Sequence, residues 1–171
     1  KEGKLVVSSN EQQSEQFELL VLTLKEAGYE QYEISNFGLA GFHSRHNSSY
    51  WKFQPYLGIG PSAHSFDGKV RRWNVRNNTL YTNQVGKNDK WFETEHLSAN
   101  ERRNEQILLG LRTIWGLDLS TLATDWTPKE SAQITEFARL NWLTISNEKI
   151  VLTEQGKLHA DGIAAALFRV D

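Results

Sequence analysis

A helix signal, a glycine and an alternating segment follow one another near the start of the chain, and this order constrains the fold most. Ser9 stands three residues before Gln12, which is the spacing of a capping box. Apolar residues then recur at helical spacing at Phe17, Leu20, Val21, Leu24 and Ala27. Gly28 predicts the end of that helix, and Tyr32 and Ile34 alternate with polar residues as in a short strand. A helix followed directly by a strand predicts a layered α/β fold.

The elements expected in the rest of the first half are shorter. Residues 37–55 show no clean period and predict a long loop. Residues 56–60 form a short apolar run that predicts a buried strand. Asp67 and Gly68 predict a hairpin turn, and Asn74 is expected to cap a helix that ends near Gly86.

From residue 98 onward the signals are mostly helical. Ser98 and Thr127 each begin a capping-box pattern ahead of an apolar helical period. Residues 142–145 and 150–152 predict a hairpin, and a last helix is expected after Thr153. The order helix, helix, hairpin, helix is that of a winged helix, so this half is expected to form a small α-rich, winged-helix-like domain.

Charge argues against a nucleic-acid partner. The formal net charge is −2, whereas proteins that neutralise phosphates are basic. The helix that would read DNA, residues 129–140, balances Lys129 and Arg139 against Glu130 and Glu136. No apolar run approaches the roughly 18 residues of a membrane span, and the start of the chain lacks a signal-peptide pattern. We therefore expect a cytoplasmic protein without a nucleic-acid partner and without a membrane span.

Cysteine is absent from all 171 residues. This excludes disulfides, cysteine-ligated zinc, a thiol nucleophile and a cysteine-held iron–sulfur cluster within the chain. Methionine is also absent and the first residue is Lys1. We interpret the sequence as a piece of a longer protein, so part of the chemistry is expected to lie outside it.

Histidines of the first half are the candidate ligands. His43 and His46 stand three residues apart, a spacing that allows zinc binding but more often belongs to structural or solvent-exposed histidines. His46 is also followed by Tyr50 and Trp51, and an imidazole beside two aromatic rings suits a flat apolar cofactor with an axial iron ligand. Ordinary packing is the alternative for the two rings. His64 is a third candidate.

A glycine turn and one carboxylate complete the candidate groups. Residues 58–62, with the sequence GIGPS, resemble a turn that cradles a cofactor, since glycines admit a ligand to the backbone and leave N–H groups free. The segment is neither a P-loop nor a dinucleotide fingerprint, because the further residues of those motifs are missing. Glu33 ends the predicted strand and is either a functional carboxylate or an ordinary surface residue.

Longer segments around these residues resemble a known family. The segments are YEISNF at 32–37, SRHNSSYW at 44–51 and YLGIGPSAHS at 56–65. In order and spacing they resemble the radical-SAM family of oxygen-independent coproporphyrinogen III oxidases. Residues 72–74 and the closing segment 152–164 are similar to the heme-chaperone-like HemW branch of that family, and the resemblance covers nearly the whole chain.

The resemblance implies a fold in two parts. Residues 1–97 would be the C-terminal portion of a partial (β/α) barrel, and residues 98–171 the small helical C-terminal domain. The family holds a [4Fe–4S] cluster and S-adenosylmethionine (SAM) through a three-cysteine motif. That motif is missing here, so this chain by itself is not expected to carry the cluster or to cleave SAM, and both cofactors are assigned to the longer parent.

The resemblance also assigns site residues. It implies a heme-binding motif at His46, Asn47, Tyr50 and Trp51, with His46 as the iron ligand. The backbone contacts to SAM that it implies come from Gly58, Gly60, Ser62 and Ala63. It further implies that Glu33, Ser35 and Asn36 face the mouth of the barrel.

Two functions follow from the resemblance. In the first, the parent protein holds heme and passes it to acceptor proteins. In the second, it decarboxylates the propionates of coproporphyrinogen III. The motif around His46 favours the first, because the oxidase substrate is metal-free and needs no iron ligand. A third hypothesis, for this chain taken alone, is a structural module that binds no ligand.

Overall fold

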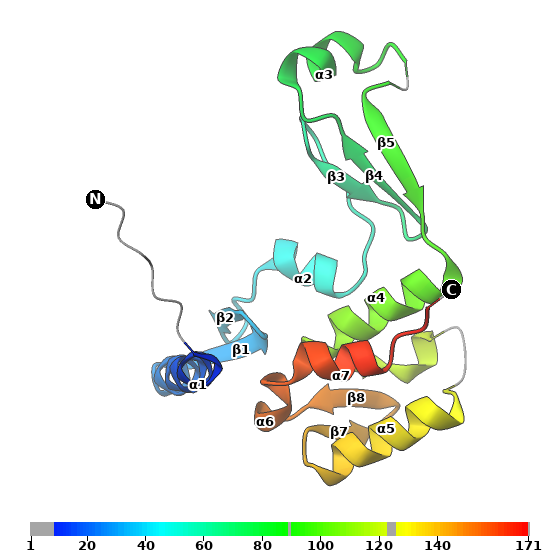
Figure 1. The fold of residues 1–171 in the computed structure, drawn as a ribbon. Coiled ribbons are helices and arrows are strands. Elements are labelled where there is room, and N and C mark those ends of the chain that lie inside the picture. The colour runs from blue at the N-terminus through cyan, green and yellow to red at the C-terminus, as the bar shows by residue number, and fades with distance from the viewer. Residues whose placement is uncertain (1–8, 89, 123–125, 171) are drawn as a thin grey trace. The chain divides into compact units, whose positions relative to one another are not determined.

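The computed structural model describes residues 9–88, 90–122 and 126–170. By its internal contacts the chain divides into two compact units, Lys1–His43 and Ser44–Asp171 (Figure 1). This division does not test the boundary expected at residue 97, which concerns the domains of the family and stays a prediction. Residues 1–8 lie outside the described residues. The expectation that the start of the chain is not a signal peptide falls on this segment.

The first unit is a helix followed by a two-stranded antiparallel sheet. It comprises α1 (Asn10–Glu26), β1 (Tyr29–Glu33) and β2 (Asn36–Leu39). The capping box is confirmed, because the Ser9 side chain accepts from the backbone N–H of Gln12 while the Gln12 side chain accepts from that of Ser9. Gly28 follows the helix at φ +84°, a left-handed conformation that suits glycine. The predicted apolar stripe of α1 is not buried in this structure.

The second unit begins with a helix where a loop was expected. The prediction of a long loop over 37–55 is wrong, since this range contains most of β2 and all of α2 (Arg45–Trp51). Such short elements leave too few residues for a readable period. Their ends are set instead by strand pairing and by the cap at Ser44, whose Oγ accepts from the N–H of Asn47 at 3.2 Å.

The predicted strand at residues 56–60 is also wrong. Only Tyr56 forms a bridge, with Phe66, and the segment then departs from the sheet. Leu57 and Ile59 are 71% and 83% exposed, so the apolar run does not enter the core.

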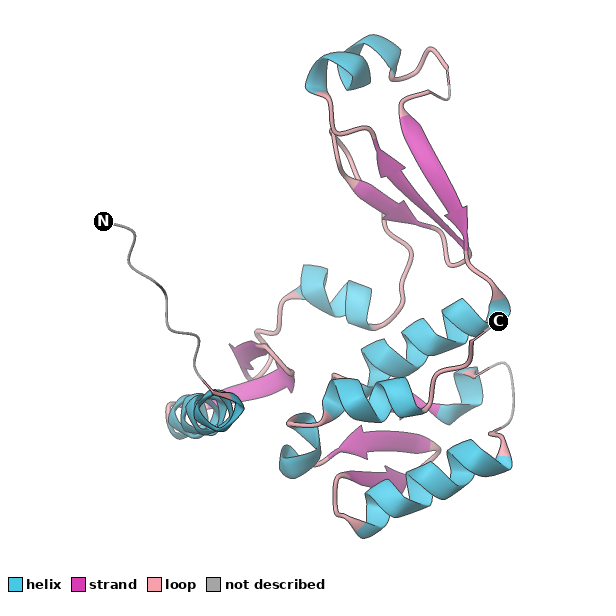
Figure 2. Cartoon of the chain, viewed as in Figure 1, coloured by secondary structure: helices cyan, strands magenta, loops and turns pink. Residues whose placement is uncertain are grey.

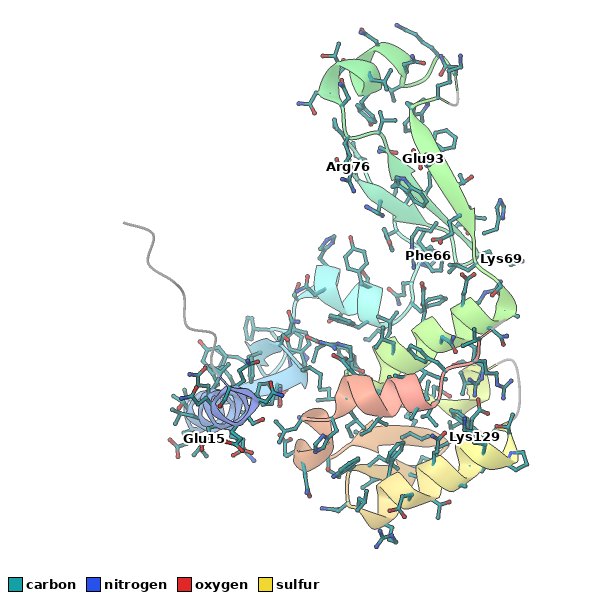
Figure 3. The ribbon with its side chains drawn as sticks, viewed as in Figure 1. Glu15, Phe66, Lys69, Arg76, Glu93 and Lys129 are labelled. Carbon is teal, nitrogen blue, oxygen red and sulfur yellow. The ribbon has the colours of Figure 1, made fainter. Side chains whose placement is uncertain are left out.

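A three-stranded antiparallel sheet follows, built from β3 (His64–Phe66), β4 (Val70–Asn74) and β5 (Phe92–His96). The predicted turn is confirmed, with Gly68 at φ +99°. Figure 3 shows Phe66 and Lys69 near this turn and Arg76 and Glu93 toward the other end of the sheet.

The helix α3 (Asn78–Gln84) connects β4 to β5, but its cap was predicted wrongly. Asn77 Oδ1 accepts from the N–H of Leu80 at 2.9 Å, whereas Asn74 is a buried residue at the end of β4. Both asparagines precede the same helical run, so only the course of the strand decides between them.

The rest of the second unit is a three-stranded sheet with helices packed against it (Figure 2). Its elements are α4 (Ala99–Leu111), β6 (Leu117–Asp118), a 3₁₀ turn (Leu119–Thr121), α5 (Pro128–Arg139), β7 (Leu143–Ser146), β8 (Lys149–Leu152), α6 (Glu154–Lys157) and α7 (Ala160–Ala166). The strand order is β6-β8-β7, all antiparallel. The capping boxes at Ser98 and Thr127 are confirmed.

The predicted hairpin of this sheet is also confirmed, and it turns at Asn147 and Glu148 with φ values of +49° and +59°. The single last helix is replaced by two short ones, α6 and α7.

The core of this part joins α4, the sheet and α7. Its most buried apolar side chains are Ile107, Leu111, Leu117, Leu143, Ile150, Ile163 and Leu167. The described residues thus form a mixed α/β structure with seven α-helices and three small antiparallel sheets. Among the described helices, none combines the length and the apolar character that crossing a membrane requires.

Candidate functional site

The four residues of the predicted heme motif lie on α2. His46 is exposed at its first turn, and Asn47, Tyr50 and Trp51 are half-buried. At about 3.6 residues per turn, His46 and Tyr50 project from one side of the helix, and Asn47 and Trp51 from another. The imidazole of His46 meets the ring of Tyr50 edge to face, with 4.9 Å between the centroids. The structure therefore brings His46 and Tyr50 together and directs Trp51 elsewhere.

Tyr50 lines a cavity of about 280 Å³, named here the Tyr50 cavity. Its lining residues are Tyr50, Phe53, Gln54, Tyr56, Phe66, Arg71, Glu105, Leu108 and Leu109. The rings of Tyr50 and Tyr56 pack edge to face at 4.5 Å, and those of Phe53 and Phe66 at 4.8 Å. Burial is the main cause that raises the pKa of Tyr56, so its hydroxyl stays neutral at physiological pH.

The charges at the Tyr50 cavity neutralise each other. Arg71 Nη2 donates to Glu105 Oε1 at 2.6 Å, and Arg71 Nη1 lies 3.4 Å from Glu95 Oε2. Burial alone would lower the pKa of Arg71, but the hydrogen bond and charge of Glu105 outweigh it and raise the pKa. The guanidinium is therefore already engaged by carboxylates of the chain.

Trp51 lines a second cavity, of about 530 Å³, named here the Trp51 cavity. Trp115, Lys52 and Lys149 also line it, and Lys52 Nζ lies 4.4 Å from the centroid of the Trp115 ring. The indole N–H of Trp51 is buried and has no hydrogen-bond partner. This side of α2 thus combines two tryptophans with two lysines and the carboxylate of Asp118.

Neither of the other two candidate histidines, His43 and His64, belongs to a metal site among the described residues. His43 belongs to the first unit, where its Nε2 lies 3.0 Å from Glu30 Oε2 and its ring stacks on Tyr32 at 4.5 Å. His64 stands opposite Trp73 in the β3–β4 pair, with ring centroids 6.3 Å apart. Over residues 9–88, 90–122 and 126–170, no three His, Cys, Asp or Glu side chains are grouped closely enough to hold a metal ion. The hypothesis of a zinc site gains no support from these residues.

The four amides that the resemblance assigns to SAM, those of Gly58, Gly60, Ser62 and Ala63, are not free in this structure. The amides donate within the chain, from Gly58 to Ser65 Oγ (2.9 Å), Gly60 to Tyr81 OH (3.2 Å), Ser62 to Val75 O (3.1 Å) and Ala63 to Gly60 O (3.3 Å). A Cβ at Gly58 would come within 2.1 Å of the carbonyl oxygen of His64. Glycine is needed there for close packing of the chain on itself, and these amides do not fit an N–H cradle for SAM.

Glu33 is not a surface residue. It is 2% exposed, and its Oε2 accepts hydrogen bonds from the N–H of Ser35 at 2.9 Å and from Nδ2 of Asn36. The two neighbours therefore satisfy the buried carboxylate where β1 turns into β2. The predicted orientation of these three residues toward a barrel mouth stays a prediction.

Sequence reasoning named the motif on α2 but missed the side chains that complete its surroundings. Phe66, Leu108 and Arg71 reach the Tyr50 cavity from β3, α4 and β4, and Trp115 reaches the Trp51 cavity from the turn before β6. For Lys52 the sequence offered one indication of a place near the site, because this residue directly follows the motif.

Residues 97–159 match the family model of the HemN C-terminal domain. The protein named heme chaperone HemW of Bacillus subtilis is 30% identical over 169 residues, covering 96% of this chain and 45% of that protein. HemW of Mycobacterium tuberculosis H37Rv is 30% identical over 166 residues, covering 96% and 42%. The bovine mitochondrial protein named radical S-adenosyl methionine domain-containing protein 1 is 42% identical over 128 residues, covering 68% and 28%. The chain belongs to this HemN/HemW family.

One solved structure has a similar fold. It is the coproporphyrinogen III oxidase HemN of Escherichia coli, described as a radical SAM enzyme, with a TM-score of 0.67 and 17% identity over 94% of this chain and 42% of that one. The chain thus spans less than half the length of the HemW relatives described above and of this structure.

Proposed function

We propose that the chain is the C-terminal part of a heme-binding, HemW-like protein and that α2 carries its heme ligand. The observation that carries this proposal is the exposed imidazole of His46, packed edge to face on Tyr50 beside an aromatic cavity. Heme here is a cargo rather than a resident cofactor.

The residues on α2 fit such a cargo chemically. A neutral imidazole is a common axial ligand of heme iron, and His46 is open to solvent at the start of the helix. Tyr50 fixes one edge of the imidazole while leaving the ring exposed. The match to HemW relatives over 96% of the chain supports the same function.

The parent's radical chemistry cannot be performed by this chain alone. With no cysteine in the sequence, it has no thiolate ligands for a [4Fe–4S] cluster. The amides of Gly58, Gly60, Ser62 and Ala63 donate within the chain. We therefore place the cluster and the SAM site in the longer parent, together with any enzyme activity. Transfer of heme to acceptor proteins and a cytoplasmic location are part of the same proposal.

For the fold, we infer that residues up to 97 complete a partial (β/α) barrel and that residues 98–171 form a winged-helix-like domain. The order α4, α5, the β7–β8 hairpin and α7 supports the second part. The similarity to the HemN fold supports the first. Coproporphyrinogen oxidation is not favoured, because the relatives at 30% identity over 96% of the chain are named heme chaperones.

A hemin titration followed by the Soret band tests the proposal. We expect saturable binding with a shifted band, and a weaker or altered band for His46→Ala. His64→Ala is the matched control, since His64 is also exposed but lies on β3. Equal titrations for all three proteins would remove His46 as the ligand, and absence of binding would contradict heme binding by this chain.

A further inference from the structure

We propose that the Tyr50 cavity receives an uncharged edge of the tetrapyrrole, so that the site selects ligands whose carboxylates are confined to the opposite edge. This inference rests on the proposed function, because it takes His46 as the iron ligand. It adds the class of tetrapyrrole that the site accepts and the residues that select it.

The cavity lies next to the proposed ligand. His46 contacts Tyr50, and Tyr50 in turn forms part of the cavity wall and packs on Tyr56. A single aromatic ring therefore separates the imidazole from the cavity. A tetrapyrrole extends on all sides of its iron, so a macrocycle bound at His46 can direct one edge past Tyr50.

The walls of the cavity favour an apolar occupant. Phe53, Phe66, Leu108 and Leu109 supply most of the lining beside the two tyrosines. Burying methyl and vinyl groups against such side chains is favourable, by roughly 25 cal/mol for each Å² removed from water.

The same cavity opposes a carboxylate. Arg71, its cationic lining residue, is held by Glu105 at 2.6 Å and faces Glu95 at 3.4 Å. An incoming carboxylate would lose its hydration without gaining an uncommitted cation, and it would meet the negative charge of Glu105. The Arg71–Glu105 pair therefore disfavours binding of a carboxylate-bearing edge in this cavity.

The other side of α2 has the opposite character. Lys52 and Lys149 both line the Trp51 cavity, and both are exposed, so they outnumber its one carboxylate, Asp118. The cations that could meet carboxylates lie on this side of the helix, which is consistent with an apolar edge on the Tyr50 side.

The experiment compares two iron tetrapyrroles that offer His46 the same metal. Hemin carries two carboxylates on one edge, whereas iron(III) coproporphyrin III carries four, distributed around the ring. We expect this chain to bind hemin at least roughly tenfold more tightly in Soret titrations. Equal dissociation constants would overturn the inference while leaving heme binding intact, and no hemin binding would overturn the proposed function together with it.

Two variants locate the selection in the cavity. Glu105→Gln frees Arg71 from its nearest carboxylate, and Leu108→Arg adds a cation to the wall. Each substitution should bring the dissociation constants of the two iron tetrapyrroles closer together, reducing their ratio by roughly three- to tenfold. Glu136→Gln is the matched control, because it frees Arg139 of an exposed pair on α5. The ratio of the two dissociation constants is compared within each protein, so a general loss of binding cancels, and an unchanged ratio in both cavity variants would overturn the assignment.

Discussion

Arg103 in α4 and Glu130 in α5 form a buried ion pair, with Arg103 Nη2 and Glu130 Oε1 3.1 Å apart and side chains that are 2% and 6% exposed. Arg169 also donates to the same carboxylate, through Nη2 at 2.8 Å and Nε at 2.9 Å. Arg103 Nη1 donates to the carbonyl of Leu167 at 3.0 Å. One carboxylate therefore ties together α4, α5 and the segment after α7.

Removing this carboxylate should strongly destabilise the second unit. Glu130→Ala leaves Arg103 buried without its counter-charge, a change that typically costs about 3–5 kcal/mol. Urea unfolding followed by circular dichroism measures the loss. Glu136→Ala should lose at most about 1 kcal/mol, because its pair with Arg139 is exposed. Similar losses in the two variants would show that the buried network is not important for stability.

The same carboxylate should make stability fall in acid. Burial alone would raise the pKa of Glu130, but hydrogen bonds from Arg169 and Thr127 and the charge of Arg103 lower it to about 2 from 4.5. A folded-state pKa below the unfolded value gives stability that is present above pH 4.5 and lost as the pH falls toward 2. The shift corresponds to about 3 kcal/mol.

Urea midpoints measured between pH 2 and pH 7 test this dependence. The wild-type chain should lose stability on acidification, and Glu130→Gln should be less stable at neutral pH but lose less between pH 4.5 and pH 2. Parallel pH curves for the two proteins would assign the acid loss to other groups.

Two glycine substitutions should have opposite effects. A Cβ at Gly156 would come within 1.7 Å of the backbone carbonyl oxygen of Trp142, so Gly156→Ala must displace backbone and should destabilise by at least about 1–3 kcal/mol. Gly162 lies inside α7 with no atom near its missing Cβ, so Gly162→Ala should stabilise by about 0.5–1 kcal/mol. Thermal melts of the two variants test this: a stabilised Gly156→Ala would refute the close approach, and a destabilised Gly162→Ala would refute the prediction for α7.

Asn74 should hold the exposed glycine turn in place. Its Nδ2 donates to the carbonyl of Gly60 at 2.8 Å and to that of Gly58 at 3.4 Å. Asn74→Ala should therefore destabilise by about 1–3 kcal/mol and increase proteolysis near residues 56–62. Asn83→Ala, on the exposed face of α3, should leave both properties unchanged. Equal protease sensitivity in the two variants would count against this role.

Much of the secondary structure was predictable because its signals are local. A capping box needs only the side chain and backbone of residues three positions apart, and all three predicted boxes form, at Ser9, Ser98 and Thr127. The turns at Asp67–Gly68 and Asn147–Glu148 are equally local, since a few dihedral angles decide them.

The errors occur where partners distant in the sequence decide. The apolar run with Leu57 and Ile59 predicted a strand. The segment is instead held by hydrogen bonds with the side chains of Asn74 and Tyr81, and it has no full strand partner. Asn74 itself was predicted to cap a helix, and Glu33 was predicted to be either a functional carboxylate or a surface residue. Both are buried. Burial of each polar side chain depends on which other groups satisfy it.

For the candidate site, the sequence by itself determined that the four motif residues lie within residues 46–51 and that cysteine ligands are absent from the chain. It predicted a loop there, and only the structure showed that the motif forms α2. Only the tertiary structure decided that Tyr50 and Trp51 line different cavities, one with neutralised charges and one with exposed lysines. A cavity is formed by side chains from several elements, and the pairing of Arg71 with Glu105 spans two of them. Such relationships depend on packing at long sequence separation, which no local pattern records.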